Sequence, residues 1–356
     1  MTGYNRRFMF SLIIPCHNPD KTIRRLFDSL KRQTIDQSDL EIIVVDDNSD
    51  SLDYRKVIDE YGLNVKYAET DTDVHCPGNT REAGMPLVTR NWLCFVDQDD
   101  FFEDDAFEQV QKYIRNTHDH PIFMVSTIFR TYDEVKKTKY KDYAHKQAWL
   151  HGKFYSMSNF IDPFDIHFKK DLVTHEDIYF NALCLAHLYN LRADWDYLDV
   201  YTYCWVDNPD SLTRRVTEDR GYLFENFNDY LVSAAGPYWE QSKFKSNIVF
   251  RNQVIMTLLH AYFYYEFASY YYTGENYKDV IELIRSFLNR MITELDMQPD
   301  FIIDFVYADA IKYRKVEEDC LIYCPNFIPK TSFRDFVYRL SNTKENEKEV
   351  SYGHRY

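Results

Sequence analysis

The chain reads FVDQDD over residues 95–100, where an apolar run typical of a buried strand leads directly into three carboxylates. Closely spaced carboxylates repel one another and raise each other's pKa unless a cation lies between them. An Asp-x-Asp pair at a strand end therefore suits a hard divalent metal, with a phosphate-bearing ligand completing the coordination shell. The alternative is an acidic turn that caps the next helix, and the surrounding sequence must decide between the two.

Before residue 100, apolar runs alternate with segments whose apolar residues recur at helical spacing. The runs that predict strands are residues 10–15, 41–45, 64–68 and 92–96. The clearest helical pattern between them is Ile23, Leu26, Phe27 and Leu30. Apolarity in residues 42–45 is continuous, which is typical of a parallel strand covered on both faces. This alternation predicts an α/β fold with a doubly wound sheet.

Polar clusters follow three of these runs. They are PCHN at residues 15–18, DDNS at residues 46–49 and DQDD at residues 97–100. Ligands of such sheets bind at the carboxyl ends of the strands, so three clusters at one edge favour a binding site over three coincidental helix caps. The chain has no G-x-G-x-x-G after the first strand and no P-loop motif, which argues against those two kinds of nucleotide site.

The composition is that of a folded, acidic protein. The 356 residues include 45% hydrophobic residues and carry a formal net charge of -15. This charge argues against a broad nucleic-acid-binding surface but leaves a local basic groove open. No apolar run approaches the roughly 18 residues that a membrane span needs. The seven scattered cysteines favour a reducing compartment. We therefore expect a cytoplasmic protein, with peripheral contact to a membrane left open.

Six short motifs occur in order along the first 215 residues. They are SLIIPCHN (11–18), IVVDDNS (43–49), GNTREAG (78–84), FVDQDD (95–100), HED (175–177) and SLTRR (211–215). This set resembles the motifs of the family-2 glycosyltransferases, inverting enzymes with the GT-A fold that use nucleotide sugars. The resemblance implies a Rossmann-like nucleotide-binding sheet within a catalytic domain over residues 1–216, of the hexosyltransferase type. Pro15 and Cys16 stand where many relatives have Thr, Ser or Tyr nearby, which leaves the nucleobase unsettled.

The resemblance implies a donor site for a nucleotide sugar, which we expect to be a UDP-sugar. The residues assigned to it are Pro15, His17, Asn18, Asp46, Asp47, Gly78, Asn79, Arg81, Asp97, Gln98, Glu176, Ser211 and Arg214. Asp47 would accept a hydrogen bond from a uracil-like imide or from sugar hydroxyls. Arg81 would contact phosphate or nucleobase, unless it is a solvated helix arginine. Ser211, Arg214 and Arg215 would close over the diphosphate as a lid, unless they form a polar linker.

The same resemblance implies a metal site and a catalytic base. Asp99 corresponds to the principal ligand of Mn²⁺ or Mg²⁺, and Asp97 to a residue that faces the ribose or the metal. Asp100 either belongs to this group of metal-site residues or caps the next helix. Asp177, at the predicted start of a helix, corresponds to the base that takes the acceptor's proton in an inverting displacement. The alternative for Asp177 is a helix N-cap.

Residues 124–168 are expected to supply the acceptor side. The segment WLHGKFY (149–155) resembles the family's Gly-Lys-aromatic segment, and on that basis we assign His151 and Lys153 to the acceptor. A basic stretch precedes it: Lys136, Lys137, Lys139, Lys141 and Lys146. This stretch is either a solvated face or a contact for an anionic acceptor, such as a phosphate polymer or nucleic acid.

After residue 215, apolar residues recur at helical spacing and glycine is scarce. We predict a helical domain over residues 217–340, for acceptor binding or for homo-oligomerisation, and a flexible tail over residues 341–356. Residues 263–272 (FYYEFASYYY) are aromatic on all faces of a helix, which predicts burial or pairing. Ordinary core, a dimer interface and an acceptor platform all remain open for this run.

The sequence therefore predicts a metal-dependent inverting glycosyltransferase. It would move a sugar from a nucleotide donor to a hydroxyl of a glycan, a phosphate polymer or another acceptor. Two alternatives stay open: an inactive homologue that binds sugars or partners, and a glycosyltransferase that acts on modified nucleic acid. A nucleotidyltransferase also uses paired carboxylates, but residues 16–19 (CHNP) are unlike the Gly-rich basic loop that those enzymes usually carry.

Overall fold

The computed structural model describes residues 9–19, 22–144 and 149–207, together with residues 229, 232, 233, 236 and 237. The chain divides into two units, Met1–Pro237 and Tyr238–Tyr356, and every described residue belongs to the first. Apart from those five isolated positions, the predicted helical domain and the tail lie outside the described residues, so both remain predictions. Among the described helices, none has the length and apolarity that a bilayer crossing requires.

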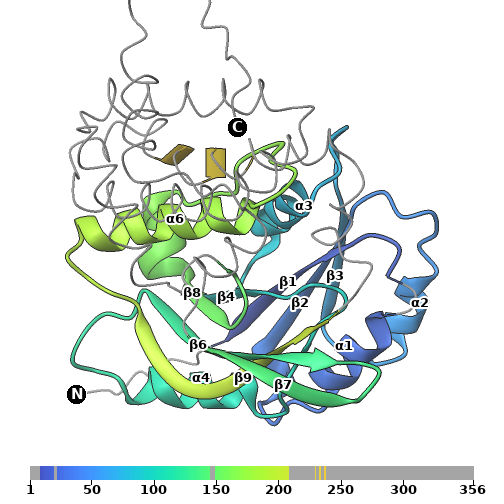
Figure 1. The fold of residues 1–356 in the computed structure, drawn as a ribbon, viewed down its shortest axis with the longest axis horizontal. Helices are drawn as coiled ribbons and strands as arrows, with labels where there is room; N and C mark the ends of the chain where they lie inside the picture. Colours follow the sequence, from blue (N-terminus) through green and yellow to red (C-terminus); the bar gives the residue numbers. More distant parts are fainter. Residues whose placement is uncertain are drawn as a thin grey trace, which may run out of the picture. The chain divides into compact units, whose positions relative to one another are not determined.

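One mixed sheet forms the centre of the described region (Figure 1). Its strands are β1 (Phe10–Cys16), β2 (Leu40–Asp46), β3 (Val65–Glu69), β4 (Trp92–Phe95), β5 (Phe101–Phe102), β6 (Met124–Asp133), β7 (Thr138–Ala144), β8 (Lys153–Ser156) and β9 (Asp196–Val206). They are ordered β3-β2-β1-β4-β8-β6-β9-β5, and β7 pairs with β6 off this path. Strands β3, β2, β1 and β4 pair in parallel, whereas β8 is antiparallel to both β4 and β6.

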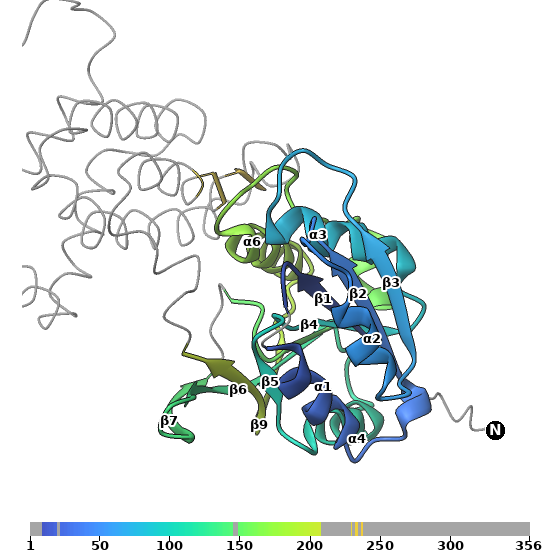
Figure 2. The ribbon, with the colours of Figure 1, turned by 90° about the vertical axis from the view of Figure 1, so that its right-hand side faces the viewer.

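Helices cover both faces of the parallel half of the sheet. They are α1 (Ile23–Lys31), α2 (Tyr54–Asp59), α3 (Pro77–Gly84), α4 (Ala106–Asn116), α5 (Asp162–Phe164) and α6 (Glu176–Asn190), with 3-10 turns at Gln37–Asp39 and Met85–Leu87 and a π turn at Met157–Ile161. Figures 1 and 2 place α1 and α4 on one side of the sheet and α3 and α6 on the other.

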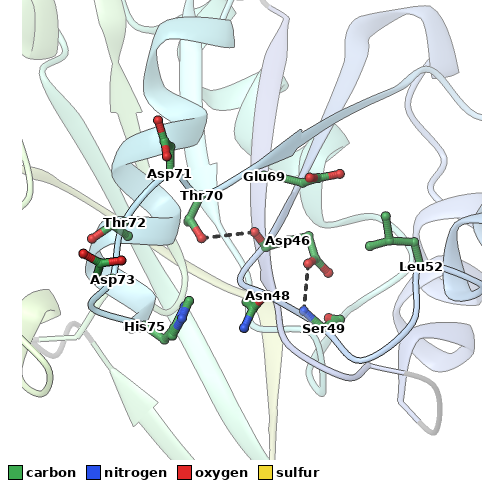
Figure 3. A pocket seen from close by; sticks show the side chains of 10 residues that line it. All are labelled: Asp46, Asn48, Ser49, Leu52, Glu69, Thr70, Asp71, Thr72, Asp73 and His75. Carbon is green, nitrogen blue, oxygen red and sulfur yellow. Dashed lines mark hydrogen bonds between the residues drawn. The ribbon is translucent and has the colours of Figure 1, made fainter.

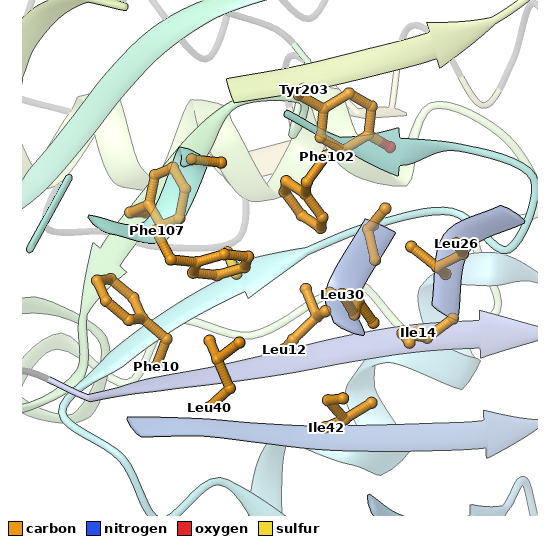
Figure 4. Packing of buried hydrophobic residues seen from close by; sticks show 14 of the residues in the cluster. Phe10, Leu12, Ile14, Leu26, Leu30, Leu40, Ile42, Phe102, Phe107 and Tyr203 are labelled. Atoms are coloured by element: carbon orange, nitrogen blue, oxygen red, sulfur yellow. The ribbon is translucent and has the colours of Figure 1, made fainter. Parts of the chain in front are cut away.

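The central strands are buried on both faces because their alternate side chains pack against helices on opposite sides. Leu12 and Ile14 of β1 share a buried cluster with Leu26 of α1 (Figure 4). On the other face, a Cβ added at Gly84 of α3 would come within 2.9 Å of Ile13, so glycine lets α3 lie directly on β1. Burial of both faces explains the continuous apolarity of these strands.

The four strands predicted before residue 100 are confirmed as β1 to β4, and their parallel pairing is confirmed as well. The predicted doubly wound parallel sheet corresponds only to the half of the observed sheet that β1 to β4 form. From β8 onward the sheet is mixed, because β8 inserts antiparallel between β4 and β6 and β9 then runs parallel to β6.

Candidate active site

The polar clusters after β1 and β4 are joined by a pair of hydrogen bonds. The His17 amide donates to Gln98 Oε1 at 2.7 Å, and Gln98 Nε2 donates to the His17 carbonyl at 2.9 Å. The ring Nδ1 of His17 also lies 2.8 Å from the Asp47 carbonyl, at the end of β2. The structure therefore brings the three predicted clusters together at one edge of the sheet, where ligands of such folds bind.

The loops after β1 and β2 are fixed to each other by Asn18. Its amide donates to Ser49 Oγ at 2.9 Å, and the amide of Asp50 donates to Asn18 Oδ1 at 2.8 Å. Asn18 has φ +48° and Asn48 has φ +58°, a left-handed conformation that asparagine adopts more readily than most residues. Asn18 therefore holds this edge in place and remains exposed beside the predicted donor site.

Asp46 and Asp47 have different surroundings, although they are adjacent in sequence. Both oxygens of Asp46 are used inside the loop, accepting from the Ser49 amide at 2.9 Å and from the Tyr54 hydroxyl at 2.8 Å. Asp47 Oδ1 accepts from Thr70 Oγ1 at 3.0 Å and lies 2.9 Å from His75 Nδ1. The carboxylate of Asp46 thus shapes the turn, which leaves Asp47 as the better candidate for contact with a ligand.

A pocket of about 480 Å³ lies beside this edge, between the end of β2, the end of β3 and residues 70–75 (Figure 3). Its lining includes four acidic side chains: Asp46, Glu69, Asp71 and Asp73. A pocket with this lining repels phosphate and suits a group rich in hydrogen-bond donors, such as sugar hydroxyls or an imide.

Arg81 of α3 connects two predicted site residues that lie far apart in sequence. It donates to Asp97 Oδ1 at 2.5 Å and, with its other terminal nitrogen, to Glu176 Oε1. Burial alone would lower the pKa of Arg81, but the Asp97 and Glu176 carboxylates raise it above its ordinary value. Arg81 is thus an interior bridge, and not the solvated helix arginine considered from the sequence.

Two further predicted residues on α3 pack against the segment that leads to α6. A Cβ at Gly78 would come within 3.0 Å of the Glu176 Cβ, so α3 and α6 approach closely at this glycine. Asn79 exchanges two hydrogen bonds with Asp171, one through Nδ2 at 3.0 Å and one through Oδ1 at 2.9 Å. Both residues therefore position Arg81 and Glu176.

Asp97, Asp100 and His151 form the candidate metal site. One ligand atom from each lies within 4.8 Å of the others. His151 Nε2 is 3.6 Å from Asp97 Oδ2 and 3.9 Å from Asp100 Oδ2, too far for good hydrogen bonds. Ligands around an octahedral ion with bonds of about 2.1 Å are separated by roughly 3.0 to 4.2 Å, so the two separations from His151 fit a small divalent cation.

The Nε2 of His151 faces the two carboxylates. Its other ring nitrogen, Nδ1, is buried and has no hydrogen-bond partner among the described residues. Burial would raise the pKa of Asp97, but the Arg81 charge and the nearby His151 hold it below its usual range. A carboxylate that stays ionised suits a hard cation such as Mg²⁺ or Mn²⁺, and the Nε2 of His151 could supply a further ligand. Asp99, the ligand expected from the sequence, is not part of this group, and its backbone carbonyl accepts from Arg25 at 2.5 Å.

Asp100 is held by the end of β9 and is not the cap of the following helix. Its two oxygens accept from the Tyr203 hydroxyl at 2.5 Å and from the Val206 amide at 2.7 Å, whereas the N-cap of α4 is Asp105. Burial, with the Asp99 and Asp97 charges, raises the pKa of Asp100. Tyr203 is a site residue that the sequence did not indicate, since it lies 103 positions away and no motif marks it.

Asp177 occupies the first turn of α6, as predicted, where the positive end of the helix favours an anion. The N-cap residue is His175, so the N-cap alternative for Asp177 is wrong. Burial and the adjacent Glu176 charge raise the pKa of Asp177 to about 7, although Arg81 and the Ile178 amide oppose the shift. A carboxyl group that titrates near neutral pH suits general base catalysis.

Lys153 lies inside the protein. Its side chain is 1% exposed, and its ammonium donates to the Trp149 carbonyl. Burial lowers the pKa of Lys153 to about 7, against the opposing charge of Asp177. This position does not favour direct contact with an acceptor, the role expected from the sequence, whereas His151 stays at the site. Pro15 lies half-buried within β1, and Ser211, Arg214 and Arg215 lie outside the described residues.

Comparison with known proteins gives a consistent family. Residues 11–187 match the family model "Glycosyl transferase family 2". The poly(ribitol-phosphate) beta-N-acetylglucosaminyltransferase TarS of Staphylococcus aureus is 25% identical over 178 residues, which cover 47% of this chain and 31% of TarS. The poly(ribitol-phosphate) beta-glucosyltransferase of Bacillus spizizenii is 34% identical over 98 residues, or 27% of this chain and 16% of that protein. The chain thus spans less than a third of the length of these two relatives.

The fold has a solved counterpart. The crystal structure of S. aureus TarS 1-349 in complex with UDP-GlcNAc superposes with a TM-score of 0.61 at 18% identity, covering 87% of this chain and 91% of that one. At this identity the likeness supports the GT-A fold and nothing finer. Together, the family match over residues 11–187, the fold and the motif order show that this chain belongs to glycosyltransferase family 2.

Proposed function

We propose that the protein transfers a sugar from a UDP-sugar to a hydroxyl group of a phosphate-containing polymer, with inversion at the anomeric carbon. The observation that carries the proposal is the connection through Arg81. The Asp97–Asp100–His151 group at the end of β4 is joined by Arg81 to Glu176, the neighbour of Asp177 on α6. Arg81 therefore joins a candidate cation site to the first turn of the helix that carries a candidate base.

The donor would lie along the ends of β1, β2 and β4. Asp47 and the acidic pocket offer acceptors for the imide and hydroxyl groups of a uridine, and they disfavour phosphate. The diphosphate would lie toward Asp97, Asp100 and His151, which are the described residues that would hold Mn²⁺ or Mg²⁺. Such an ion, when bound, stabilises the negative charge of the departing diphosphate. The complex of the related TarS with UDP-GlcNAc supports a UDP-sugar as donor.

Asp177 would act as the general base. With a pKa of about 7, a substantial fraction is ionised at neutral pH, and the group still binds a proton strongly enough to take it from a hydroxyl. Direct displacement with a single base inverts the anomeric configuration. Glu176 is committed to Arg81, so its role would be to position the first turn of α6.

The acceptor is suggested by the relatives and by charge. Both relatives described above are named for poly(ribitol-phosphate). The lysines around β7 supply positive charge in a chain of net charge -15, which fits an anionic polymer. The relatives differ in the sugar they transfer, so both UDP-GlcNAc and UDP-glucose are reasonable donors to test.

The test is a transfer assay with the full chain, poly(ribitol phosphate), each of the two donors and Mn²⁺, in which UDP release and labelled polymer are measured. We expect polymer-dependent UDP release that a chelator abolishes. Asp177→Asn should lose most of its transfer activity, and Asp165→Asn, which removes a carboxylate that is 92% exposed, serves as the matched control. Donor binding without any transfer would instead favour the inactive sugar-binding homologue.

A further inference from the structure

The face of the sheet beside His151 carries an aromatic and basic surface that the donor site does not use. We propose that this surface, formed by Trp149 and Trp205 with Tyr143 and Lys141, binds the incoming acceptor polymer. The aromatic rings would contact the carbon-bound hydrogens of the polyol or sugar units, and the lysine would contact a phosphate. The inference rests on the proposed function and locates its acceptor.

The strand register places these residues on one face. Thr131 of β6 pairs with Lys141 of β7 on one side and with Trp205 of β9 on the other. Two residues earlier on β6, Phe129 pairs with Tyr143 and with Tyr203. Because side chains alternate with a period of two, both rows point to the same side of these three adjacent strands, which Figure 2 shows next to one another.

The rings on this face form a continuous layer that reaches the candidate metal site. The rings of Phe129 and Tyr143 stack with centroids 4.8 Å apart, and Trp149 lies 5.4 Å from Tyr143 and 6.2 Å from Trp205. The ring of His151 lies 4.9 Å from that of Tyr203. An acceptor on this layer would therefore end beside the candidate metal site, where we place the donor diphosphate.

The layer is incompletely covered. Trp149, Trp205 and Tyr143 are each only partly buried, unlike Phe129, which is 1% exposed. The accessible parts of these three rings are therefore available to a ligand that lies on the layer.

Charge at the outer end of the layer suits phosphate. Lys136 pairs with Asp133 at 2.9 Å, and Lys139 pairs with Glu103. Lys141 is not paired with a carboxylate in the described part of the chain, and its Nζ lies 4.7 Å from the centroid of the Tyr143 ring. Of the three, Lys141 is therefore the cation that combines an aromatic neighbour with charge available to an anion.

The experiment compares Trp205→Ala and Lys141→Glu with two matched controls in the full chain. Tyr197→Ala removes an aromatic ring that is 46% exposed at the opposite end of β9, and Lys56→Glu reverses a charge on α2. Binding of poly(ribitol phosphate) is measured directly by calorimetry, and the KM values for polymer and for UDP-sugar are measured separately.

We expect Trp205→Ala to raise the polymer Kd and KM about tenfold, as the loss of one aromatic contact does. Lys141→Glu should raise both about three- to tenfold and weaken their dependence on salt. The UDP-sugar KM should stay within twofold, and both controls should resemble the wild type. Lys141 is exposed, so its variant folds and tests the proposal even if Trp205→Ala does not.

Unchanged polymer binding in both variants would overturn the proposal, whatever the enzyme's activity. If the wild type binds the polymer through this surface but transfers no sugar to it, the proposed function fails while the surface stands. If wild-type transfer occurs and the polymer KM is insensitive to both substitutions, the proposed function stands and the acceptor binds elsewhere.

Discussion

The guanidinium of Arg81 on α3 lies 2.5 Å from Asp97 Oδ1 at the end of β4, and its other terminal nitrogen donates to Glu176 at the start of α6. One side chain thus fixes the distance between the candidate metal site and the helix that carries the candidate base. A bidentate bridge of this kind needs the planar fork of arginine, because a lysine ammonium cannot reach both carboxylates with the same geometry.

Removing this bridge should destabilise the protein and stop the reaction. Arg81→Ala leaves Asp97 and Glu176 without their shared cation, and breaking a buried ion pair in this way typically costs about 3–5 kcal/mol. Chemical denaturation should show this loss, whereas Arg24→Ala, which breaks an exposed pair with Glu60, should cost less than about 1 kcal/mol. Arg81→Lys should recover part of the stability but little activity. Equal stability of the two alanine variants would contradict the bridging role.

Asp177→Asn should separate catalysis from donor binding. We expect kcat to fall by about 10²–10⁴-fold, the usual cost of losing a general base, while the UDP-sugar Kd changes by no more than a few-fold. Steady-state kinetics and calorimetry measure the two quantities. If donor affinity falls and kcat does not, Asp177 is a ligand clamp and the base must be sought elsewhere.

The pH dependence of the reaction should report the same residue. Since burial and Glu176 raise the pKa of Asp177 to about 7, kcat should rise with pH through this value as the base loses its proton. The free energy of unfolding should change with pH in the opposite direction to kcat. Between the ordinary pKa near 4 and about 7, the folded state holds a proton that the unfolded state has released, so the contribution of Asp177 to the free energy of unfolding falls as pH rises. Asp177→Asn should remove this slope; an identical slope in the variant would assign it to another group.

Metal removal and two substitutions should identify the cation ligands. We expect a chelator to abolish transfer and Mn²⁺ to restore it. His151→Gln should raise the Mn²⁺ concentration needed for half-maximal activity by at least about tenfold, given that even outer-shell changes often cost 10–100-fold. Asp99→Ala tests the ligand expected from the sequence, which predicts loss of transfer with the fold intact. If both variants depend on Mn²⁺ as the wild type does, neither His151 nor Asp99 is a metal ligand.

The sequence alone determined the parallel half of the sheet and the residues at its ligand-binding edge. A short continuous apolar run such as residues 42–45 favours a strand covered on both faces, and the polar clusters that follow such strands meet where parallel strands end. Asp97, Asp177 and His17 were therefore recognisable as site candidates from local patterns and motif order. The helical spacing after residue 215 still predicts a second domain outside the described residues.

Only the tertiary structure decided what each polar group contacts. It separates the roles of the neighbours Asp46 and Asp47, buries Lys153 and joins Asp100 to Tyr203 across 103 positions of sequence. The antiparallel insertion of β8, which brings His151 to Asp97, is likewise a pairing between distant segments. Local sequence fixes which residues are polar and where strands end, but hydrogen bonds and burial depend on contacts between segments far apart in the chain, and a single sequence carries no direct signal for those.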